Sequence, residues 1–417
     1  MVALQGWVNA KRVVGGIVFL EIIPENLVQP VTAVFKKSEN RDLWKEAKKV
    51  KIGTAVRIEG EYSRVRLSKR GEEFKPTKFE VITPPVDILP IDLTGKTPVL
   101  FDTKLKYRYL MLRLPKERAI FKIRARLLKH VRDFLEKNDF LEVHTPKIVG
   151  AGAEGGATLF ELDYFGRKAF LAQSPQLYKQ MLITSIPRVY EITPYFRAEQ
   201  HHTTRHLNEC WGIDVEMGFI SSVEDILKLL EELLSSTIEY IRETCKEELE
   251  ILGVDLKLPR RPFPRLTYDN VIQLLEERGI KVTWGEDLSD REERVLGSIM
   301  KEKGYDLYFI VRYPWETKPF YIMRRDGYSE SFDLDYKGLE ISSGGQREHR
   351  YTELLRNIRD KGLDPMDFEF YLEAFKYGMP PHGGFGLGVE RLLMKMLDME
   401  NIRETIIFTR DIHRLIP

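Results

Sequence analysis

Two pairs of charged residues have the spacing that places chemical groups on one face of a β-sheet. Residues 188–219 contain the run YFRAE, with Arg197 and Glu199 two residues apart, and a later run in which Asp214 and Glu216 are two apart. Side chains alternate between the faces of a strand, so each pair shares a face. We predict a β-hairpin that forms the floor of a polar site. The alternative is a solvated sheet face with ordinary ion pairs.

A glycine-rich segment near the C-terminus is a second candidate element. Gly384, Gly386 and Gly388 alternate, and Arg391 follows at the start of an expected helix. Alternating glycines leave one face of a strand bare, so a flat or charged ligand can approach the backbone closely. The GxGxG spacing differs from the GxGxxG of dinucleotide-binding folds. Tight packing between strand and helix is the alternative explanation.

The segment SFDLDYKGLE carries two acids that could share a cation, Asp333 and Glu340. A two-residue turn at Tyr336 and Lys337 would place them directly opposite on adjacent strands, with Cβ atoms about 5 Å apart. Carboxylates this close need a cation or a proton between them. Mg²⁺ bound to nucleotide phosphates fits, because it takes few carboxylates. The alternative is an exposed hairpin with one protonated or solvated acid.

Three segments, in order, resemble the signature motifs of the class II aminoacyl-tRNA synthetases. A helical run ending in FLEVHTPKI resembles the first motif, FRAE with its histidine-bearing loop the second, and GFGLGVER the third. Within that class FLAQSPQLYKQ, EISSGGQREHR and YGMPPHGGFGLG are most similar to archaeal-type aspartyl-tRNA synthetases. The resemblance implies an enzyme that activates L-aspartate with ATP to aspartyl-adenylate and transfers it to the 3′ end of tRNA.

The resemblance also implies roles for single residues. The amino-acid pocket would include Glu154, Ser174, Gln176, Lys179, Asp214 and Arg347. The ATP site would include Arg197, Glu199, His206, Leu207, Glu340, Gly388 and Arg391, with Arg197 and Arg391 as the catalytic residues. Mg²⁺ would bind Asp333, Glu340 and Ser343. Many relatives stack a phenylalanine on adenine where this chain has Cys210, so His206 or Trp211 would take that role.

The chemistry of free aspartate agrees with this assignment. Its side-chain carboxylate needs fixed cations, for which Lys179 and Arg347 are suitable, and its ammonium needs an acid such as Asp214. Asparagine carries no such charge and would leave buried cations unmatched. An asparaginyl-tRNA synthetase is the alternative within the class, and Lys179 and the PPHGG segment disfavour it. A tRNA-independent ligase resembling asparagine synthetase is another, and a nucleic-acid-binding protein without catalysis is the third.

The first 83 residues predict an OB barrel, because five short alternating segments have a helix-like segment between the third and the fourth. In the family this barrel reads the tRNA anticodon, and Arg12, Phe19 and Gln29 resemble the reading face. A place for Phe19 in the barrel core is the alternative. The Arg-Asp pair of many relatives is absent after the second strand, where the sequence reads IIPENL.

We expect an α+β protein with three parts. Residues 1–83 form the OB-fold anticodon-binding domain, 84–101 a proline-rich linker, and 102–417 a class II catalytic domain built on an antiparallel sheet flanked by helices. In the family the first motif forms a dimer interface, which places Pro146 at a homodimer contact. The acidic helical segments between residues 221 and 303 carry no recognisable chemistry and are expected to be scaffold.

Composition excludes several classes of protein. The chain has 417 residues, a net charge of +1 and 31% charged residues, so any basic surface for tRNA must be local. Two cysteines, Cys210 and Cys245, provide neither a disulfide framework nor a zinc cluster. No apolar run is long enough to span a membrane. We expect a cytoplasmic enzyme whose partners are the aspartate tRNA and, in a non-discriminating member, the asparagine tRNA.

Overall fold

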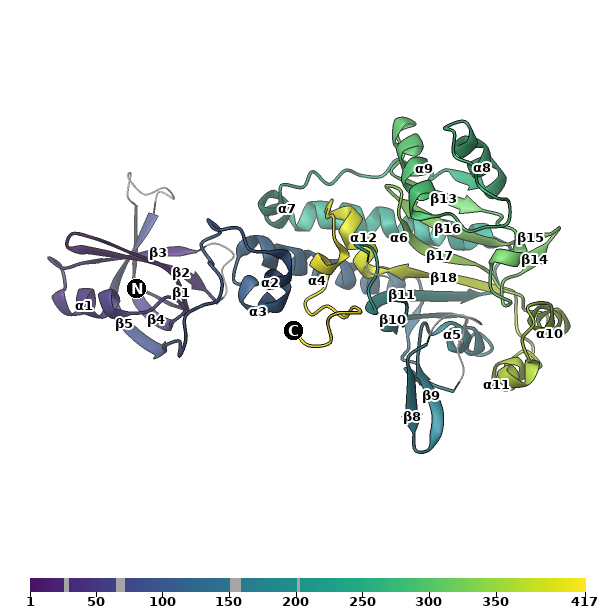
Figure 1. Ribbon diagram of the computed structural model, residues 1–417, viewed down its shortest axis with the longest axis horizontal. Coiled ribbons are helices and arrows are strands. Elements are labelled where there is room, and N and C mark those ends of the chain that lie inside the picture. Colours follow the sequence, from purple (N-terminus) through teal and green to yellow (C-terminus); the bar gives the residue numbers. More distant parts are fainter. Residues whose placement is uncertain (26–29, 65–71, 151–158, 201–202) are drawn as a thin grey trace. The chain divides into compact units, whose positions relative to one another are not determined.

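The computed structural model describes the chain except for residues 26–29, 65–71, 151–158 and 201–202 (Figure 1). Two predicted site residues, Gln29 and Glu154, therefore lie outside the described residues. The chain divides into two compact units, Met1–Ile120 together with Pro417, and Phe121–Ile416.

A closed five-stranded barrel occupies the start of the first unit, as the alternating segments predict. Its strands, joined in the order β1-β2-β3-β5-β4, are β1 (Val2–Val14), β2 (Ile17–Pro24), β3 (Val31–Lys36), β4 (Ala55–Arg64) and β5 (Glu72–Thr83). Helix α1 (Arg41–Lys49) lies between β3 and β4 in sequence, and the side chain of Asn40 caps its first turn. Val18, Leu20 and Phe74 belong to the buried core. Period-two alternation thus gives the barrel its apolar interior.

The remainder of the first unit is short helices after an extended segment. Residues 84–100 contain neither helix nor strand, and α2 (Phe101–Lys106), α3 (Arg108–Met111) and the first turn of α4 (Pro115–Lys137) follow. Arg108 is fully buried, and its Nη1 donates to Glu117 Oε2 at 2.9 Å. A small apolar cluster that includes Ile91, Leu93 and Met111 joins the extended segment to these helices.

The second unit is built on a mixed, mainly antiparallel sheet of eight strands (Figure 1). In spatial order the strands are β12 (Arg265–Thr267), β13 (Leu307–Val311), β16 (Ser331–Tyr336), β17 (Glu340–Gln346), β18 (His382–Gly388), β11 (Glu209–Gly218), β10 (Arg188–Phe196) and β6 (Leu141–Glu142). The two outermost pairs are parallel. The predicted fold class, α+β with an antiparallel catalytic sheet, is confirmed.

Helices and a small second sheet surround the large sheet. The helices are α4, α5 (Gln176–Leu182), α6 (Val223–Thr244), α7 (Lys246–Leu252), α8 (Tyr268–Glu276), α9 (Asp290–Glu302), α10 (Tyr351–Asp360), α11 (Glu369–Ala374) and α12 (Val389–Met396). Helix α6 contacts β17 and β18, and its buried face is formed by residues such as Ile226, Leu230 and Leu234. The small sheet has the order β7 (Ile148–Val149), β9 (Arg167–Leu171) and β8 (Glu161–Tyr164).

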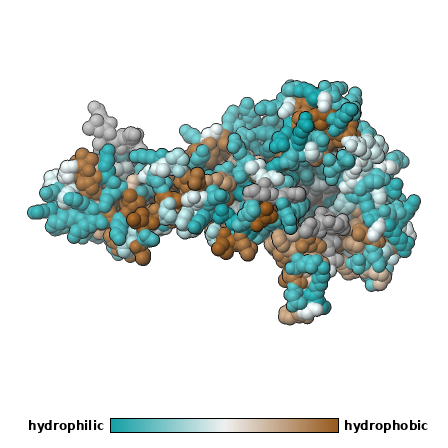
Figure 2. All heavy atoms as spheres, in the orientation of Figure 1, coloured by the Kyte–Doolittle hydropathy of each residue, from teal (hydrophilic) through white to brown (hydrophobic). Residues whose placement is uncertain are grey.

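Hydrophilic residues cover most of the face shown in Figure 2. None of the helices in the described ranges combines the length and the apolar character that crossing a membrane requires.

Candidate active site

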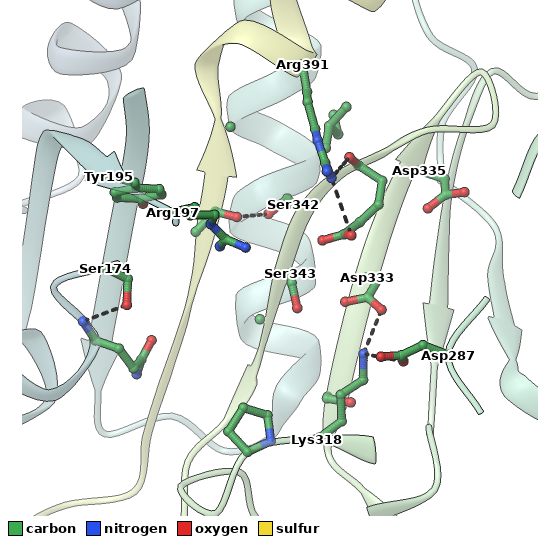
Figure 3. A pocket seen from close by; sticks show the side chains of 18 of the residues that line it. Ser174, Tyr195, Arg197, Asp287, Lys318, Asp333, Asp335, Ser342, Ser343 and Arg391 are labelled. Carbon is green, nitrogen blue, oxygen red and sulfur yellow. Dashed lines mark hydrogen bonds and ion pairs between the residues drawn. The ribbon is translucent and has the colours of Figure 1, made fainter. Parts of the chain in front are cut away.

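A cavity of about 470 Å³ opens over the middle of the large sheet, where β10, β11, β18, β17 and β16 lie next to one another. Most of the predicted site residues line it. They are Ser174, Gln176, Arg197, Glu199, His206, Leu207, Asp214, Asp333, Glu340, Ser343, Arg347, Gly388 and Arg391. The fold thus brings residues between positions 174 and 391 of the sequence together around one cavity (Figure 3).

The predicted hairpin is present and forms the floor of this cavity. Strands β10 and β11 pair antiparallel, with Tyr195 opposite Cys210 and Glu191 opposite Asp214. Arg197 follows directly after β10, and its Nη1 lies 3.7 Å from Glu199 Oε1. The backbone carbonyls of both residues accept from Asn208 Nδ2, at 2.7 and 3.0 Å. These two hydrogen bonds hold the backbone in place at Arg197 and Glu199, whose side chains line the cavity.

Two cations and two acids form a buried network at the end of the cavity beside α5. Lys179 Nζ donates to Asp214 Oδ1 at 2.9 Å and lies 3.3 Å from Glu216 Oε2. Arg347 donates to the other oxygen of Glu216 through Nε at 3.0 Å. All four side chains are almost fully buried. Arg347 and Asp214 line the cavity, whereas Lys179 lies behind this lining and compensates the acids from within the protein.

The pKa values of the two acids differ because their neighbours differ. Burial raises the pKa of Asp214 above its ordinary value, and Lys179 offsets this only in part. Burial opposes ionisation of Glu216 too, but Arg347 and Lys179 together outweigh it and leave its pKa below the ordinary value. The second oxygen of Asp214, Oδ2, is buried and has no hydrogen-bond partner among the described residues. Asp214 thus has a free acceptor at the cavity.

A chain of amides fixes the orientation of Gln176 beside this network. Arg347 Nη2 donates to Gln176 Oε1 at 3.2 Å, and Gln176 Nε2 donates to Gln180 Oε1 at 2.8 Å. Gln180 Nε2 lies 3.1 Å from His382 Nε2, and His382 Nδ1 lies 2.9 Å from the Pro380 carbonyl. A carbonyl only accepts, so Nδ1 carries the proton and Nε2 accepts from Gln180. Burial lowers the pKa of His382 to about 4, consistent with this neutral form.

The predicted register of β16 and β17 is wrong. Asp335, not Asp333, is opposite Glu340, and Asp333 is opposite Ser343, with a bulge between these pairs. The turn consists of Lys337 and Gly338, both with positive φ, one residue later than predicted. A two-residue hairpin turn of this type favours glycine in its second position, which Gly338 supplies. Asp333, Glu340 and Ser343 nevertheless all line the cavity, as does Asp335.

A lysine accompanies the predicted metal ligands. Lys318 Nζ donates to Asp333 Oδ2 at 2.8 Å and lies 4.0 Å from Asp287 Oδ1 (Figure 3). The other oxygen, Asp333 Oδ1, is buried and has no hydrogen-bond partner among the described residues. No group of three or more His, Cys, Asp or Glu within the described ranges is arranged to hold a metal by itself. Two carboxylates and a hydroxyl around a phosphate site are the donors that Mg²⁺ uses in nucleotide complexes.

Residues 221–303, which the sequence predicts to be scaffold, also contribute to the cavity lining. Asp287, Leu288 and Glu293 from this segment line the cavity. Arg205, in the loop between β10 and β11, lies 2.7 Å from Asp290 and also pairs with Glu293. Nothing in the local sequence marks these acids, because only the folded chain brings α9 to the loop. Asp335 could have been predicted as a cavity residue, because it lies two residues after Asp333 on the same strand and therefore on the same face.

The two candidates for stacking on the adenine, His206 and Trp211, differ in their access to the cavity. Cys210 lines the cavity, and Trp211, the next residue, does not belong to the lining. His206 does line it, and its Nδ1 lies 2.6 Å from Thr203 Oγ1. Arg391 projects from α12, and its Nη1 donates to the Glu340 carbonyl at 2.9 Å. Of the two predicted candidates, His206 is the one with access to the cavity.

Two predicted residues outside the cavity lie at surfaces. On the barrel, Phe19 is only partly buried, and the Arg12 guanidinium lies 4.8 Å from its ring centroid. The core position that was the alternative for Phe19 is thereby excluded. In the second unit Pro146 is exposed, between β6 and β7.

The sequence profile of the tRNA synthetases class II (D, K and N) matches residues 101–412. This chain is a class II aminoacyl-tRNA synthetase. The synthetase is 51% identical to the aspartate–tRNA(Asp) ligase of Pyrococcus horikoshii, over 100% of this chain and 96% of that protein. It is 47% identical to the aspartate–tRNA(Asp/Asn) ligase of Methanopyrus kandleri, with the same coverage of both chains.

Solved structures agree with the family. The asparaginyl-tRNA synthetase of P. horikoshii complexed with asparaginyl-adenylate has a TM-score of 0.91 and 36% identity, and the match covers 100% of this chain and 96% of that chain. The synthetase therefore shares its fold with enzymes of both amino-acid specificities, and the choice between them depends on the residues of the site.

Proposed function

We propose that this synthetase is an aspartate–tRNA ligase, which forms aspartyl-adenylate from L-aspartate and ATP and transfers the aspartyl group to the 3′ end of tRNA. The observation that carries the proposal is the buried network at the amino-acid end of the cavity. Arg347, held by Glu216 and Gln176, offers a fixed guanidinium to a ligand carboxylate. Asp214, with its unpartnered oxygen, offers an acceptor to a ligand ammonium.

The residues of the cavity then perform activation mainly by positioning. Asp214 and Gln176 hold the ammonium, Arg347 holds the side-chain carboxylate, and Lys179 keeps the surrounding acids neutralised. One oxygen of the α-carboxylate attacks the α-phosphorus of ATP, and pyrophosphate leaves with the electron pair of the broken bond. Arg197 neutralises charge on the α-phosphate, and little proton transfer is needed.

The nucleotide is held by residues from three elements. Glu199 accepts from the adenine amino group, Arg391 stacks on the base, and the bare backbone at Gly388 allows close approach. His206 and Leu207 complete this end of the cavity. Asp333, Glu340 and Ser343 would hold Mg²⁺, which when bound neutralises phosphate charge. Lys318 supplies the charge that Asp333 requires in the absence of the ion.

Pyrophosphate exchange tests the amino-acid specificity. We expect ATP–pyrophosphate exchange that depends on aspartate and is at least about 100-fold weaker with asparagine, because an amide leaves the buried guanidinium unmatched. Exchange with asparagine at a comparable rate would contradict the proposal and favour an asparaginyl-tRNA synthetase. Strong aspartate exchange without charging of any tRNA would instead favour a tRNA-independent ligase.

A non-discriminating enzyme that also charges asparagine tRNA is the second candidate. It is favoured by the 47% identity to the M. kandleri relative, whose name includes both tRNAs. Charging assays with purified aspartate and asparagine tRNAs distinguish the two. Residues 1–83, with Arg12 and Phe19 on the outside of the barrel, would read the anticodon, followed by the linker 84–101 and the catalytic domain 102–417.

We also infer a homodimer in the cytoplasm. The edge strand β6 and the segment to β7 carry exposed apolar residues, Leu141, Pro146 and Ile148, which suit a contact between two copies. Sedimentation velocity should give the mass of two chains. A monomer at micromolar concentration would contradict the dimer.

A further inference from the structure

Tyr195 is a cavity residue that neither the motifs nor the mechanism above uses. It lies on β10, two residues before Arg197, and points to the same face (Figure 3). The side chain is 7% exposed and lines the cavity. Its hydroxyl is buried and has no hydrogen-bond partner among the described residues. Buried hydroxyls are nearly always paired, so this one points to a ligand or a bound water.

The ring of Tyr195 occupies the space that a side chain at position 212 would take. A Cβ added to Gly212 would lie 2.0 Å from the tyrosine Oη and 2.4 Å from Cε2. Glycine at this position is therefore what allows the ring to cross β11. The hydroxyl ends close to β18, the strand next to β11 in the sheet.

The position of the hydroxyl relates it to the proposed ammonium site. A Cβ built on Gly386 would be 3.6 Å from Tyr195 Oη and 3.6 Å from Asp214 Oδ1. The donor and the acid thus flank the same bare stretch of backbone on β18. Asp214 Oδ2 also has no partner among the described residues, so this part of the cavity contains an unused donor and an unused acceptor.

We propose that the Tyr195 hydroxyl binds the α-carboxylate of the amino acid. This inference rests on the proposed function. With the ammonium on Asp214 and the α-phosphate on Arg197, the α-carboxylate must lie between them, because it is bonded to the carbon that bears the ammonium. One carboxylate oxygen forms the bond to phosphorus as pyrophosphate departs. The hydroxyl donates to the other oxygen, which becomes the carbonyl of the adenylate, and no proton is transferred.

Two adenylate analogues test this contact. The aspartyl sulfamate of adenosine keeps the carbonyl oxygen, whereas aspartol adenylate lacks it. Titration calorimetry should show that Tyr195→Phe weakens the sulfamate about 10-fold, the typical effect of one hydrogen bond, and changes aspartol adenylate less than about twofold. Tyr268→Phe is the matched control, because it removes a buried hydroxyl that bonds the Glu286 carbonyl, and neither residue belongs to the cavity lining. It should leave both affinities unchanged.

The possible results separate this inference from the proposed function. The role of Tyr195 is overturned if Tyr195→Phe, while unfolding at the wild-type temperature, weakens the binding of both analogues equally. It is also overturned if the variant binds both analogues as tightly as the wild type, which is the result expected for a hydroxyl that bonds only water. Failure of the wild-type enzyme to exchange pyrophosphate with aspartate overturns the proposed function, and the inference falls with it. Steady-state exchange adds a check, since the KM for aspartate should rise while the KM for ATP stays within twofold.

Discussion

At the end of the cavity beside α5, four buried charged residues neutralise one another. Lys179 and Arg347 bring two positive charges, and Asp214 and Glu216 bring two negative ones, with almost no exposure to solvent. Such a network is stable only while every member is present, because an unpaired ion in the interior costs several kcal/mol. The specificity of the site and the stability of the fold are therefore linked at these residues.

The first prediction concerns Lys179. Lys179→Met should lower the free energy of unfolding by roughly 3–5 kcal/mol, because it leaves Asp214 and Glu216 with one cation between them. Denaturant unfolding measures this. Lys129→Met, which removes a lysine from an exposed pair with Asp133, is the control and should cost less than about 1 kcal/mol. An equal loss of unfolding free energy in the two variants would show that the buried lysine stabilises the fold no more than the exposed one.

The second prediction concerns pH and His382. Its pKa is about 4 in the folded protein because of burial, against an ordinary value near 6.5, so the unfolded chain binds the proton more readily. Stability should therefore be retained above pH 6.5 and fall as the pH drops towards 4, by up to roughly 3 kcal/mol from this residue. Unfolding free energies measured across this range should have a smaller slope in His382→Gln. An unchanged slope would assign the acid sensitivity to other groups.

At the scale of elements, the hairpin of β16 and β17 decides which acids of these two strands face the cavity. Its turn at Lys337 and Gly338 packs against α9, where a Cβ on Gly338 would lie 2.8 Å from the Glu293 carbonyl. Gly297 of α9 is close to the same turn, since a Cβ there would lie 2.5 Å from the Gly338 Cα. Two glycines, Gly338 and Gly297, thus allow the turn to pack closely on α9, the helix that places Glu293 at the cavity.

The third prediction tests this contact with two matched glycines. Gly338 and Gly253 have φ of 69° and 73°, but a Cβ on Gly253 would meet nothing within 4 Å. Both alanine variants should lose about 1–2 kcal/mol through the left-handed backbone. Gly338→Ala should lose at least about 1 kcal/mol more, because α9 must move, and its KM for ATP should rise. Similar unfolding energies for the two would show that the turn tolerates a side chain.

At the scale of the whole molecule, the barrel proposed to bind tRNA and the cavity proposed to activate the amino acid belong to different units. The barrel has a hydrophobic core of its own, and the cavity is lined entirely by residues of the second unit. Substitutions on the outside of the barrel should therefore leave adenylate formation unchanged. The pair of Arg12 and Phe19 has the chemistry to stack on an unpaired base.

The fourth prediction follows from this separation. Phe19→Ala should raise the KM for aspartate tRNA by about 10-fold or more, as expected for the loss of one stacked base, and leave aspartate-dependent pyrophosphate exchange within twofold. Arg12→Ala should act in the same direction. Arg57→Ala removes an arginine of β4 that pairs with Glu80 of β5, and it should change neither activity. An effect of Phe19→Ala on exchange would contradict the separation.

The sequence by itself determined the elements and most of the site. Alternation at period two identified the barrel and the hairpin of Arg197 and Asp214, because each strand has its own buried face. The motifs identified thirteen residues that line one cavity. Alternation and motifs are patterns of neighbouring residues, so they can be identified in the sequence without knowledge of the fold.

Only the tertiary structure decided the rest. A one-residue shift of the turn to Lys337 and Gly338 placed Asp335 rather than Asp333 opposite Glu340, since register depends on turn geometry and on a bulge that the pattern of side chains does not show. Asp287 and Glu293 reach the cavity because α9 packs on that turn, and Tyr195 crosses β11 because Gly212 leaves space for it. Such contacts join residues far apart in sequence. They form, and stabilise the structure, only after the strands have paired.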